Sequence, residues 1–170
     1  MITKVCTRCN TDKPLSEFAI RKRMKTIINY VLPECKQCAS DRTRIHRESE
    51  HGKKLLRAYK LSPNGKARHL FKESQRSARK KDIAFDLTSE WIRERVALGK
   101  CQVTGIPFDM EPAGSNGAAR AFGASLDRID PTKGYTQDNV QVVVWIYNRA
   151  KGVQSHTEVL TLAEALCQKR

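Results

Sequence analysis

Long apolar runs are missing from this sequence. A helix that crosses a membrane needs roughly 20 consecutive apolar residues, and no such stretch occurs among the 170 residues, of which 29% are charged. The chain begins Met1-Ile-Thr-Lys-Val-Cys6, without the apolar core of a signal peptide. We therefore expect neither a membrane span nor a secretory signal, and a protein that stays in the cytoplasm.

Aromatic residues are also scarce, at 6% of the chain, and few of them fall in the basic stretch 45–81. Proteins that hold unpaired bases stack them on aromatic side chains. Such stacking is not indicated here. Contact with the backbone of a duplex fits this stretch better.

Acidic residues are outnumbered in the first half of the chain only. Residues 1–82 carry 22 Lys and Arg against 8 Asp and Glu, whereas residues 83–170 carry 10 of each, so the net charge of +14 lies in the first half. This asymmetry favours a polyanion, first of all nucleic acid. Solvated helix faces rich in Lys and Arg are the alternative. An anionic membrane is disfavoured because no apolar helix face accompanies the charge, and charge alone does not distinguish DNA from RNA.

Six cysteines in a reducing compartment indicate metal binding before disulfides. Cys6-Thr-Arg-Cys9 and Cys35-Lys-Gln-Cys38 are two Cys-x-x-Cys hooks with 25 residues between them. Two hooks supply the four thiolates of a tetrahedral zinc site, whereas a redox dithiol needs only one. We expect one structural zinc ion that staples a segment too small to fold alone. Cys101 and Cys167 have apolar neighbours and are expected to be buried.

The basic stretch 45–81 is helix-prone and broken once, at Ser62-Pro-Asn-Gly65, so it predicts two helices and shows no internal repeat. In the second helix, residues 66–82, the apolar positions (Leu70, Phe71 and Ala78) are separated from the basic ones (Arg68, Lys72, Arg76, Arg79 and Lys80). One face is therefore expected to pack and another to contact phosphate.

Three further segments have clear local patterns. Thr88 and Ser89 offer an N-cap for a helix over residues 90–98 that ends at Gly99, with core positions at Trp91, Ile92 and Val96. Residues 156–168 predict an amphipathic helix that covers the core. Residues 125–151 read as strand, turn, strand and helix, because Val140-Gln-Val-Val-Val144 is a strong β run after the turn residues 131–134.

At residues 101–151 the sequence resembles the HNH endonucleases with the ββα-metal (His-Me finger) fold. The phage-type members share the motifs Leu126-Asp-Arg-Ile-Asp130, Gly134-Tyr135, Asp138-Asn-Val140 and Asn148-Arg-Ala-Lys151. These motifs are specific as a set, although each alone is weak. The hooks and the Lys13–Phe18 segment resemble the treble-clef or zinc-ribbon fingers that precede phage HNH domains.

The resemblance implies an α+β protein in three parts. Residues 1–45 form a four-cysteine zinc finger, residues 46–82 form a basic helical linker that clamps DNA, and residues 83–170 form an HNH-like nuclease domain. A phage-encoded protein would act in the cytoplasm of the host cell.

The resemblance also implies a catalytic site. It places Asp127 and Asn148 on one Mg²⁺ or Mn²⁺ ion, and it gives Asn139 the task of holding the loop between the strands. Position 128 holds Arg where other members have the His that acts as general base. Because a guanidinium takes no proton at neutral pH, Arg128 is expected to bind the scissile phosphate. Gly152 replaces a further helical ligand and predicts an open site that prefers Mg²⁺ or Mn²⁺ over Zn²⁺.

The identity of the general base stays open at this stage. The candidates to activate the nucleophile are His69 in the basic helix, and Asp130, Tyr135 and Tyr147 within the motif. Three of the site residues also have structural explanations when each is taken alone. Asn148 could be an amide on a helix surface, Asn139 a turn residue, and Tyr147 a packed core residue. The expected DNA-binding residues are the basic ones at Arg21, Lys22, Arg23, Lys25, Arg68, Lys72, Arg76, Arg79, Lys80, Lys81, Arg120, Arg149 and Lys151.

The function that the resemblance implies is a metal-dependent endonuclease of the phage HNH type that nicks or breaks double-stranded DNA, with homing, restriction-like and packaging-associated roles all open. A monomer is favoured, with no membrane or small-molecule partner. The alternative is a zinc-stapled DNA-binding or regulatory protein whose nuclease core is degenerate, with Arg128 as the mark of the lost base. A junction-resolving nuclease fits less well. Such enzymes carry their catalytic motif close to the zinc site, whereas in this chain about ninety residues separate the cysteine hooks from Asp127.

Overall fold

The computed structural model describes residues 2–22, 29–111 and 119–169. Its contacts divide the chain into two compact units, Met1–Leu56 and Arg57–Arg170. The boundary falls inside a helix of the stretch predicted as a linker. The division into finger, linker and nuclease domain stays a prediction.

The first unit combines two small hairpins with a helix. Strand β1 (Thr3–Val5) pairs with β2 (Asp12–Pro14), a 3-10 turn η1 (Leu15–Glu17) follows, β3 (Phe18–Lys22) pairs with β4 (Asn29–Cys35), and α1 (Lys36–Glu48) begins directly after β4. Its core is small: Phe18, Cys6 and Cys35 are buried, with Val31 and Cys38 packed against them. So few buried side chains give little hydrophobic stabilisation, which agrees with the expected need for a metal staple.

The helical stretch of residues 45–81 is broken twice, where the sequence predicted one break. After α1 come α2 (Glu50–Leu61) and α3 (Pro63–Lys81), so the predicted break near Ser62 is confirmed and a second break occurs at Ser49. The sequence around Ser49 contains no Pro, so the turn signals of the sequence did not reveal it.

The two breaks are built alike, at Ser49-Glu-His-Gly52 and Ser62-Pro-Asn-Gly65. In each, the Ser hydroxyl donates to the carbonyl three residues earlier at 2.7 Å and accepts from the N–H of the Gly three residues later at 3.1 Å. A Cβ on either Gly would lie only 1.8 Å (Gly52) or 2.0 Å (Gly65) from a backbone carbonyl oxygen of the preceding helix. The Ser-x-x-Gly joint therefore recurs after 13 residues, a repeat that the sequence analysis did not identify.

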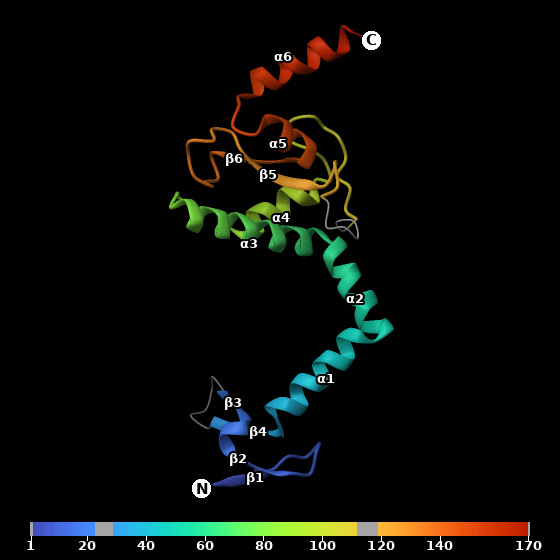
Figure 1. Cartoon of the computed structure of the whole chain (residues 1–170), viewed down its shortest axis with the longest axis vertical. Helices are drawn as coiled ribbons and strands as arrows, with labels where there is room; N and C mark the ends of the chain where they lie inside the picture. The colour runs from blue at the N-terminus through green and yellow to red at the C-terminus, as the bar shows by residue number, and fades with distance from the viewer. Residues whose placement is uncertain (1, 23–28, 112–118, 170) are drawn as a thin grey trace. The chain divides into compact units, whose positions relative to one another are not determined.

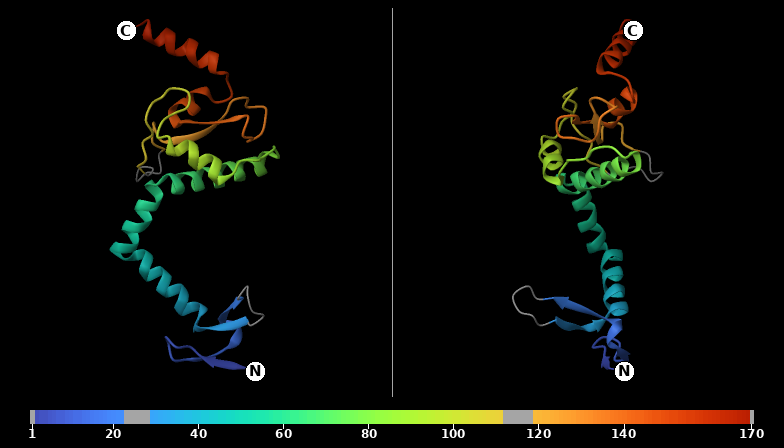
Figure 2. Two further views of the ribbon diagram at one scale, coloured as in Figure 1. Left: turned by 180° about the vertical axis from the view of Figure 1, so that it is seen from behind. Right: turned by 90° about the vertical axis from the view of Figure 1, so that its left-hand side faces the viewer.

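The second unit is layered around one hairpin. Strand β5 (Ala124–Arg128) pairs antiparallel with β6 (Val140–Val144), with Asp127 opposite Gln141, and α5 (Trp145–Lys151) follows β6 at once. Helices α3 and α4 (Ser89–Ala97) lie on one side of the hairpin and α5 lies on the other (Figures 1 and 2). The predicted α+β class and the strand–loop–strand–helix order of residues 125–151 are confirmed.

The core of this unit lies between the hairpin and its helices. Its members include Trp91, Ile92 and Val96 of α4, Cys101, and the Val residues of β6. The Thr88 hydroxyl accepts from the Trp91 N–H at 3.1 Å, so the predicted cap of α4 is confirmed. Leu70 and Phe71 of α3 pack against this core, and Ala78 of the same face is buried, as their positions predicted.

The last helix, α6 (His156–Cys167), does not cover the core as predicted. Among its apolar side chains, Val159 packs against the core, whereas Leu160, Leu162 and Leu166 are 46%, 56% and 64% exposed. A capping box between Ser155 and Glu158 stabilises the helix start without burial. Cys167 is exposed as well, so the prediction of its burial was wrong. Among the described residues, no helix combines the length and apolar character that crossing a bilayer requires.

Gly65→Ala tests the joint between α2 and α3. Helix propensity alone would favour Ala by about 1 kcal/mol, but the close carbonyl of Tyr59 should make the variant less stable by about 1–3 kcal/mol. Urea unfolding followed by tryptophan fluorescence measures this change, because both tryptophans lie in the second unit.

The matched control is Asn64→Ala, the exposed neighbour in the same helical turn. It should change the free energy of unfolding by no more than about 0.5 kcal/mol. A stabilised Gly65→Ala protein would contradict the close approach of the two helices at this joint.

Candidate functional site

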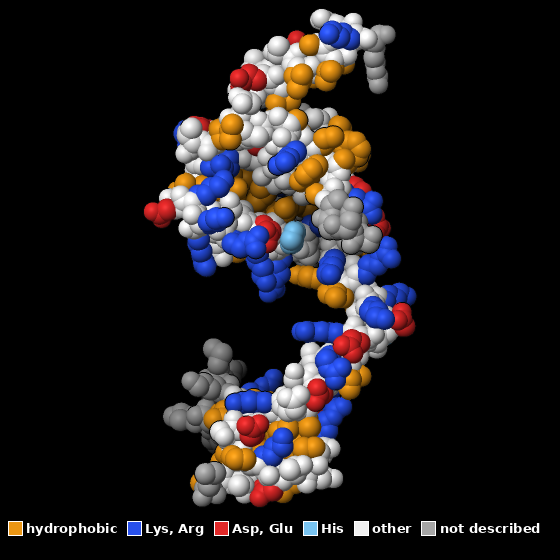
Figure 3. Space-filling model, in the orientation of Figure 1, with side chains coloured by type: hydrophobic (Ala, Val, Ile, Leu, Met, Phe, Trp, Pro, Cys, Tyr) orange, Lys and Arg blue, Asp and Glu red, His pale blue; other side chains and the backbone are white. Residues whose placement is uncertain are grey.

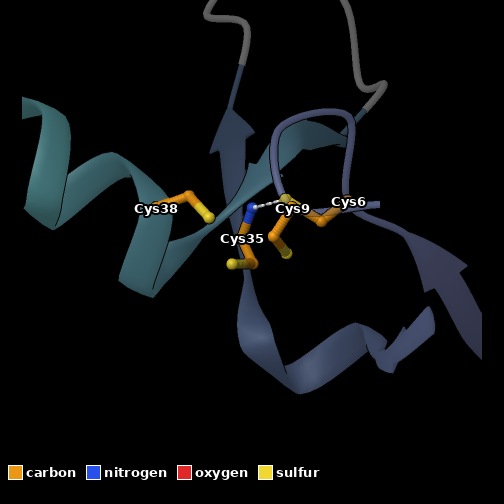
Figure 4. Close-up of side chains that lie close together, drawn as sticks. All are labelled: Cys6, Cys9, Cys35 and Cys38. Atoms are coloured by element: carbon orange, nitrogen blue, oxygen red, sulfur yellow. Dashed lines mark hydrogen bonds between the residues drawn. The ribbon is translucent and has the colours of Figure 1, made fainter. Parts of the chain in front are cut away.

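The four cysteines of the two hooks come together at one point in the first unit (Figure 4). Cys6 and Cys9 lie on the turn between β1 and β2, Cys35 ends β4, and Cys38 lies in the first turn of α1. Their sulfur atoms all lie within 4.8 Å of one another. Four thiolates at about 2.3 Å from one ion stand roughly 3.8 Å apart, so the cluster fits a tetrahedral zinc ion.

Thiol electrostatics in this cluster also favour a cation. The Cys35 N–H donates to Cys6 Sγ at 3.3 Å and lowers the pKa of Cys6 to about 6. The neighbouring Cys35 thiol, by contrast, raises the pKa of Cys38 to about 12. The pKa values of Cys6 and Cys38 are thus shifted in opposite directions, and a cation bound by both sulfur atoms would favour their thiolate forms.

In the second unit, Asp127 stands near the end of β5 and is only 2% exposed. Its Oδ2 accepts from Gln141 Nε2 of the paired strand at 2.9 Å, and its Oδ1 lies 3.2 Å from Lys151 Nζ of α5. A carboxylate offers about four lone pairs, so these two partners leave acceptor capacity for one further ligand.

Asn148 projects from α5 onto the same strand. Its Nδ2 donates to Ser125 Oγ at 2.8 Å and to the Leu126 carbonyl at 2.9 Å. A carbonyl oxygen only accepts, so the atom facing Leu126 must be the amide nitrogen. The amide oxygen therefore points elsewhere, and no hydrogen bond to it occurs among the described residues. The structure thus anchors Asn148 to β5 through its amide nitrogen and leaves the amide oxygen without a hydrogen bond among the described residues.

Lys151 is not the DNA contact that the sequence predicted. It is 1% exposed, and its ammonium contacts Asp127 and donates to the Arg128 carbonyl at 2.8 Å. Asn148 and Lys151 lie three residues apart, which places them on the same face of α5. Together they fasten this helix to consecutive residues of β5.

The side chain of Asn139 spans the loop that joins β5 and β6. Its Oδ1 accepts from the Asp130 N–H at 2.9 Å, and its Nδ2 donates to the carbonyls of Asp130 at 3.0 Å and Gly134 at 2.9 Å. Asn139 is 5% exposed, so these bonds are sheltered from water. The loop from residue 130 to 134 is thereby held to the start of β6.

Arg128 lies at the mouth of this loop. Its Nη1 donates to the Lys133 carbonyl at 2.6 Å, and its guanidinium carbon lies 5.3 Å from the centre of the Tyr135 ring. A guanidinium has five N–H donors, so several remain for an anion.

Two of the four predicted base candidates are placed unfavourably for that role. Burial and the nearby Asp127 carboxylate raise the pKa of Tyr147, whose hydroxyl lies 3.0 Å from Nδ1 of His156. The Thr132 hydroxyl and N–H bind the Asp130 carboxylate and lower its pKa, which weakens it as a base.

The other two base candidates, Tyr135 and His69, lie at or near a cleft that we call the α3 cleft. Its volume is about 640 Å³, and its walls are Leu70, Glu73, Ser74, Arg76, Ser77 and Lys80 of α3, Ser125 and Leu126 of β5, Tyr135, and Asn148 of α5. Tyr135 thus lines the cleft. His69 is exposed and precedes Glu73 by one turn, on the helix face that lines it.

Basic side chains gather over α3 in this unit (Figure 3). Arg68, Lys72, Arg76, Arg79, Lys80 and Lys81 are all exposed, as are Arg120 and Arg149. Arg120 lies 4.0 Å from Asp109. In the first unit Arg21 is exposed, whereas Arg23, Lys25 and the side chain of Lys22 lie outside the described residues.

Sequence reasoning missed the partners of Asp127 and the carboxylate in the α3 cleft. Gln141 and Lys151 reach Asp127 across 14 and 24 residues. The strand register provides one signal, because alternation in two paired strands puts Gln141 opposite Asp127. Glu73 had no signal of its own, since in the sequence it is one acidic residue in a basic helix.

Cys6→Ser tests the metal cluster. We expect the wild-type protein to contain one zinc ion per chain and this variant to lose it, because a hydroxyl is a poor substitute for a thiolate. Elemental analysis of the purified proteins measures the zinc content. Cys167→Ser, which changes an exposed cysteine outside the cluster, should keep its zinc ion. A fully loaded Cys6→Ser protein would rule out the four-cysteine site.

Asn139→Ala tests the loop. The variant loses three sheltered hydrogen bonds and should be less stable by about 3 kcal/mol, measured by urea unfolding. Lys133→Ala in the same loop removes a side chain that is 68% exposed and should cost no more than about 0.5 kcal/mol. Equal effects of the two substitutions would show that Asn139 does not hold the loop.

No protein-family profile matches this sequence, and no curated protein matches it. Among solved structures, the chain is similar to PacI, a rare-cutting HNH restriction endonuclease for which a mechanism of DNA perturbation has been described. The identity is 18%, the similarity covers 96% of this chain and 93% of that chain, and the TM-score is 0.41.

Proposed function

We propose that this protein is a metal-dependent DNA endonuclease, homing or restriction-like, that hydrolyses phosphodiester bonds of duplex DNA. The observation that carries the proposal is that α5 binds β5 next to Asp127: Asn148 bonds to Ser125 and Leu126, and Lys151, one turn further on, contacts Asp127 itself. The Asn148 amide is anchored through its nitrogen to the residue before Asp127, so its oxygen is left as a ligand.

These two side chains suit a hard divalent cation. Mg²⁺ and Mn²⁺ prefer oxygen ligands, and Mg²⁺ sites in nucleic-acid enzymes commonly use one or two protein ligands plus substrate phosphate. A cation held here would supply positive charge for the scissile phosphate and the departing 3′ oxygen.

The remaining groups of the site act on the DNA strand. Arg128 has N–H donors left over from its bond to Lys133 and would hold a phosphate oxygen. Asn139 fixes the loop that contains Lys133. Because the Lys133 carbonyl accepts from Arg128, this loop keeps the guanidinium in place. Tyr135 and His69 remain the candidates to activate the attacking water.

The exposed cations of α3 support duplex DNA as the substrate. They follow a helix that also forms one wall of the α3 cleft, in which Asn148 lies. A strand bound along this helix by its phosphates would run past the proposed site. Neutralising several phosphates also makes binding strongly salt-dependent.

A second candidate is a DNA-binding regulatory protein with an inactive nuclease core. The favouring observation is that both oxygens of Asp127 already have protein partners, while Arg128 stands where a base would be expected. This candidate predicts salt-dependent DNA binding without hydrolysis.

Supercoiled plasmid and genomic DNA incubated with zinc-loaded protein test the proposal. Nicked or linear products should form with Mg²⁺ or Mn²⁺ and not with EDTA. Asp127→Asn and Asn148→Ala should each lower the rate by about 100-fold or more, because each removes a proposed ligand. Gel analysis of the products over time measures both the rate and the ratio of nicks to double-strand breaks.

The control is Asn64→Ala, an exposed amide at the start of α3, which should cut like the wild type. DNA binding by each variant, measured against salt concentration, should stay close to wild type, since the ligands are not the basic contacts. Salt-sensitive binding with no product on any DNA would support the regulatory candidate.

A further inference from the structure

The Asp127 carboxylate is already neutralised inside the protein. Lys151 Nζ lies 3.2 Å from its Oδ1, and the two side chains are 1% and 2% exposed. The ammonium also donates to the Arg128 carbonyl at 2.8 Å, so two acceptors fix its position. Little water reaches this pair, and the charge of Lys151 is therefore weakly screened.

Arg128 brings a second positive charge to the neighbouring position. Its guanidinium is always charged and faces the Tyr135 ring on the loop. Across the α3 cleft, Arg76 and Lys80 outnumber the one carboxylate, Glu73. Lys151 and Arg128 beside Asp127, and Arg76 and Lys80 across the cleft, thus place several cations around the proposed ligands, and a divalent ion that arrives alone meets their positive charge.

The described residues also lack a cluster of acidic side chains that would attract a divalent ion despite these positive charges. Sites that hold divalent cations without substrate usually gather several acidic ligands. Among the described residues, the four cysteines are the only group of three or more His, Cys, Asp or Glu side chains close enough to share an ion. Asp127 is therefore an isolated carboxylate with a resident cation beside it.

We infer that Lys151 is a positioning residue that takes the place of the divalent ion at Asp127, so that the site binds this ion only together with a DNA phosphate. The inference rests on the proposed function and adds the order of binding. DNA brings the negative charge that the protein does not provide, and the ion then joins Asp127, Asn148 and the phosphate. In the free protein, Lys151 keeps Asp127 compensated, and the second unit folds without a divalent ion.

Mn²⁺ binding to the zinc-loaded full-length protein tests this inference without reference to cleavage. Electron paramagnetic resonance measures the free Mn²⁺ that remains at equilibrium. In the absence of DNA, the wild type should show no Mn²⁺ binding that depends on Asp127. Lys151→Met and Lys151→Gln should bind Mn²⁺ on the order of 10- to 100-fold more tightly, a typical size for coupling between two ligands. Lys169→Gln removes an exposed charge elsewhere and should behave like the wild type.

Two variants are used because the loss of a buried charge can prevent folding. Lys151→Met removes the charge and every donor, whereas Lys151→Gln removes the charge but keeps an amide that can donate to Asp127. Circular dichroism establishes which of the two variants is folded. If neither folds, the comparison of Mn²⁺ binding by the wild type without and with DNA decides the inference.

The same measurement is repeated with a duplex. The complex of wild-type protein with a duplex that spans a cleaved position should bind one more Mn²⁺ ion than the free DNA and the free protein bind in total. Asn148→Ala protein on this duplex should not. A duplex with a neutral methylphosphonate at the cleaved linkage should also lose the additional ion, because the phosphate charge is gone.

The outcomes separate the inference from the proposed function. Asp127-dependent Mn²⁺ binding by the free wild type, as tight as with DNA, would overturn the inference while cleavage persisted. Folded Lys151 variants that bind Mn²⁺ no better than the wild type would overturn it too. Absence of cleavage on every DNA would refute the proposed function, whereas tighter Mn²⁺ binding by the Lys151 variants would still assign Lys151 as the resident cation.

Discussion

The buried ion pair between Lys151 and Asp127 is the interaction on which the second unit's candidate site depends. It joins the last turn of α5 to the end of β5, and the Arg128 carbonyl and Gln141 complete the hydrogen bonding of the pair. Removing one partner of such a pair commonly costs about 3–5 kcal/mol, because the other charge stays buried and unpaired. The pair therefore holds α5 against β5 and fixes the position of the proposed ligand Asp127.

The two units differ in how negative charge at their candidate sites is compensated. In the first unit the core is small, and the four-cysteine cluster fits a zinc ion whose charge would compensate the thiolates. In the second unit the core is larger, and a lysine provides the compensating charge at Asp127. A metal ion at the proposed site would therefore not be needed for folding, which is the physical basis of the order of binding inferred above.

Local patterns in the sequence predicted most of the elements around the site. The cysteine spacing, the Thr88 cap, the β run of residues 140–144 and the turn at 131–134 each depend on near neighbours, and the structure contains the corresponding elements. The first helical joint was missed because Ser49-Glu-His-Gly52 has no proline, although its geometry repeats that of the second joint.

Tertiary pairing explains what the sequence did not reveal. Lys151 looked like one more basic residue near DNA, and only the packing of α5 on β5 turns it toward Asp127. The apolar positions of α6 have the period of a buried face, yet the capping box stabilises that helix while its leucines stay exposed. Periodicity thus predicted a helix there but not what the helix contacts. The roles of Asp127, Arg128, Asn139 and Asn148 remain predictions, supported by where the structure places them.

A crystal structure of the protein with duplex DNA and Mn²⁺, analysed for anomalous scattering from manganese, tests the central claim most directly. The predicted result is one manganese ion between the Asp127 carboxylate, the Asn148 amide oxygen and a DNA phosphate, with Lys151 still bound to the Arg128 carbonyl. A manganese ion at these ligands in crystals without DNA, or DNA in the cleft with the ion bound elsewhere, would contradict it.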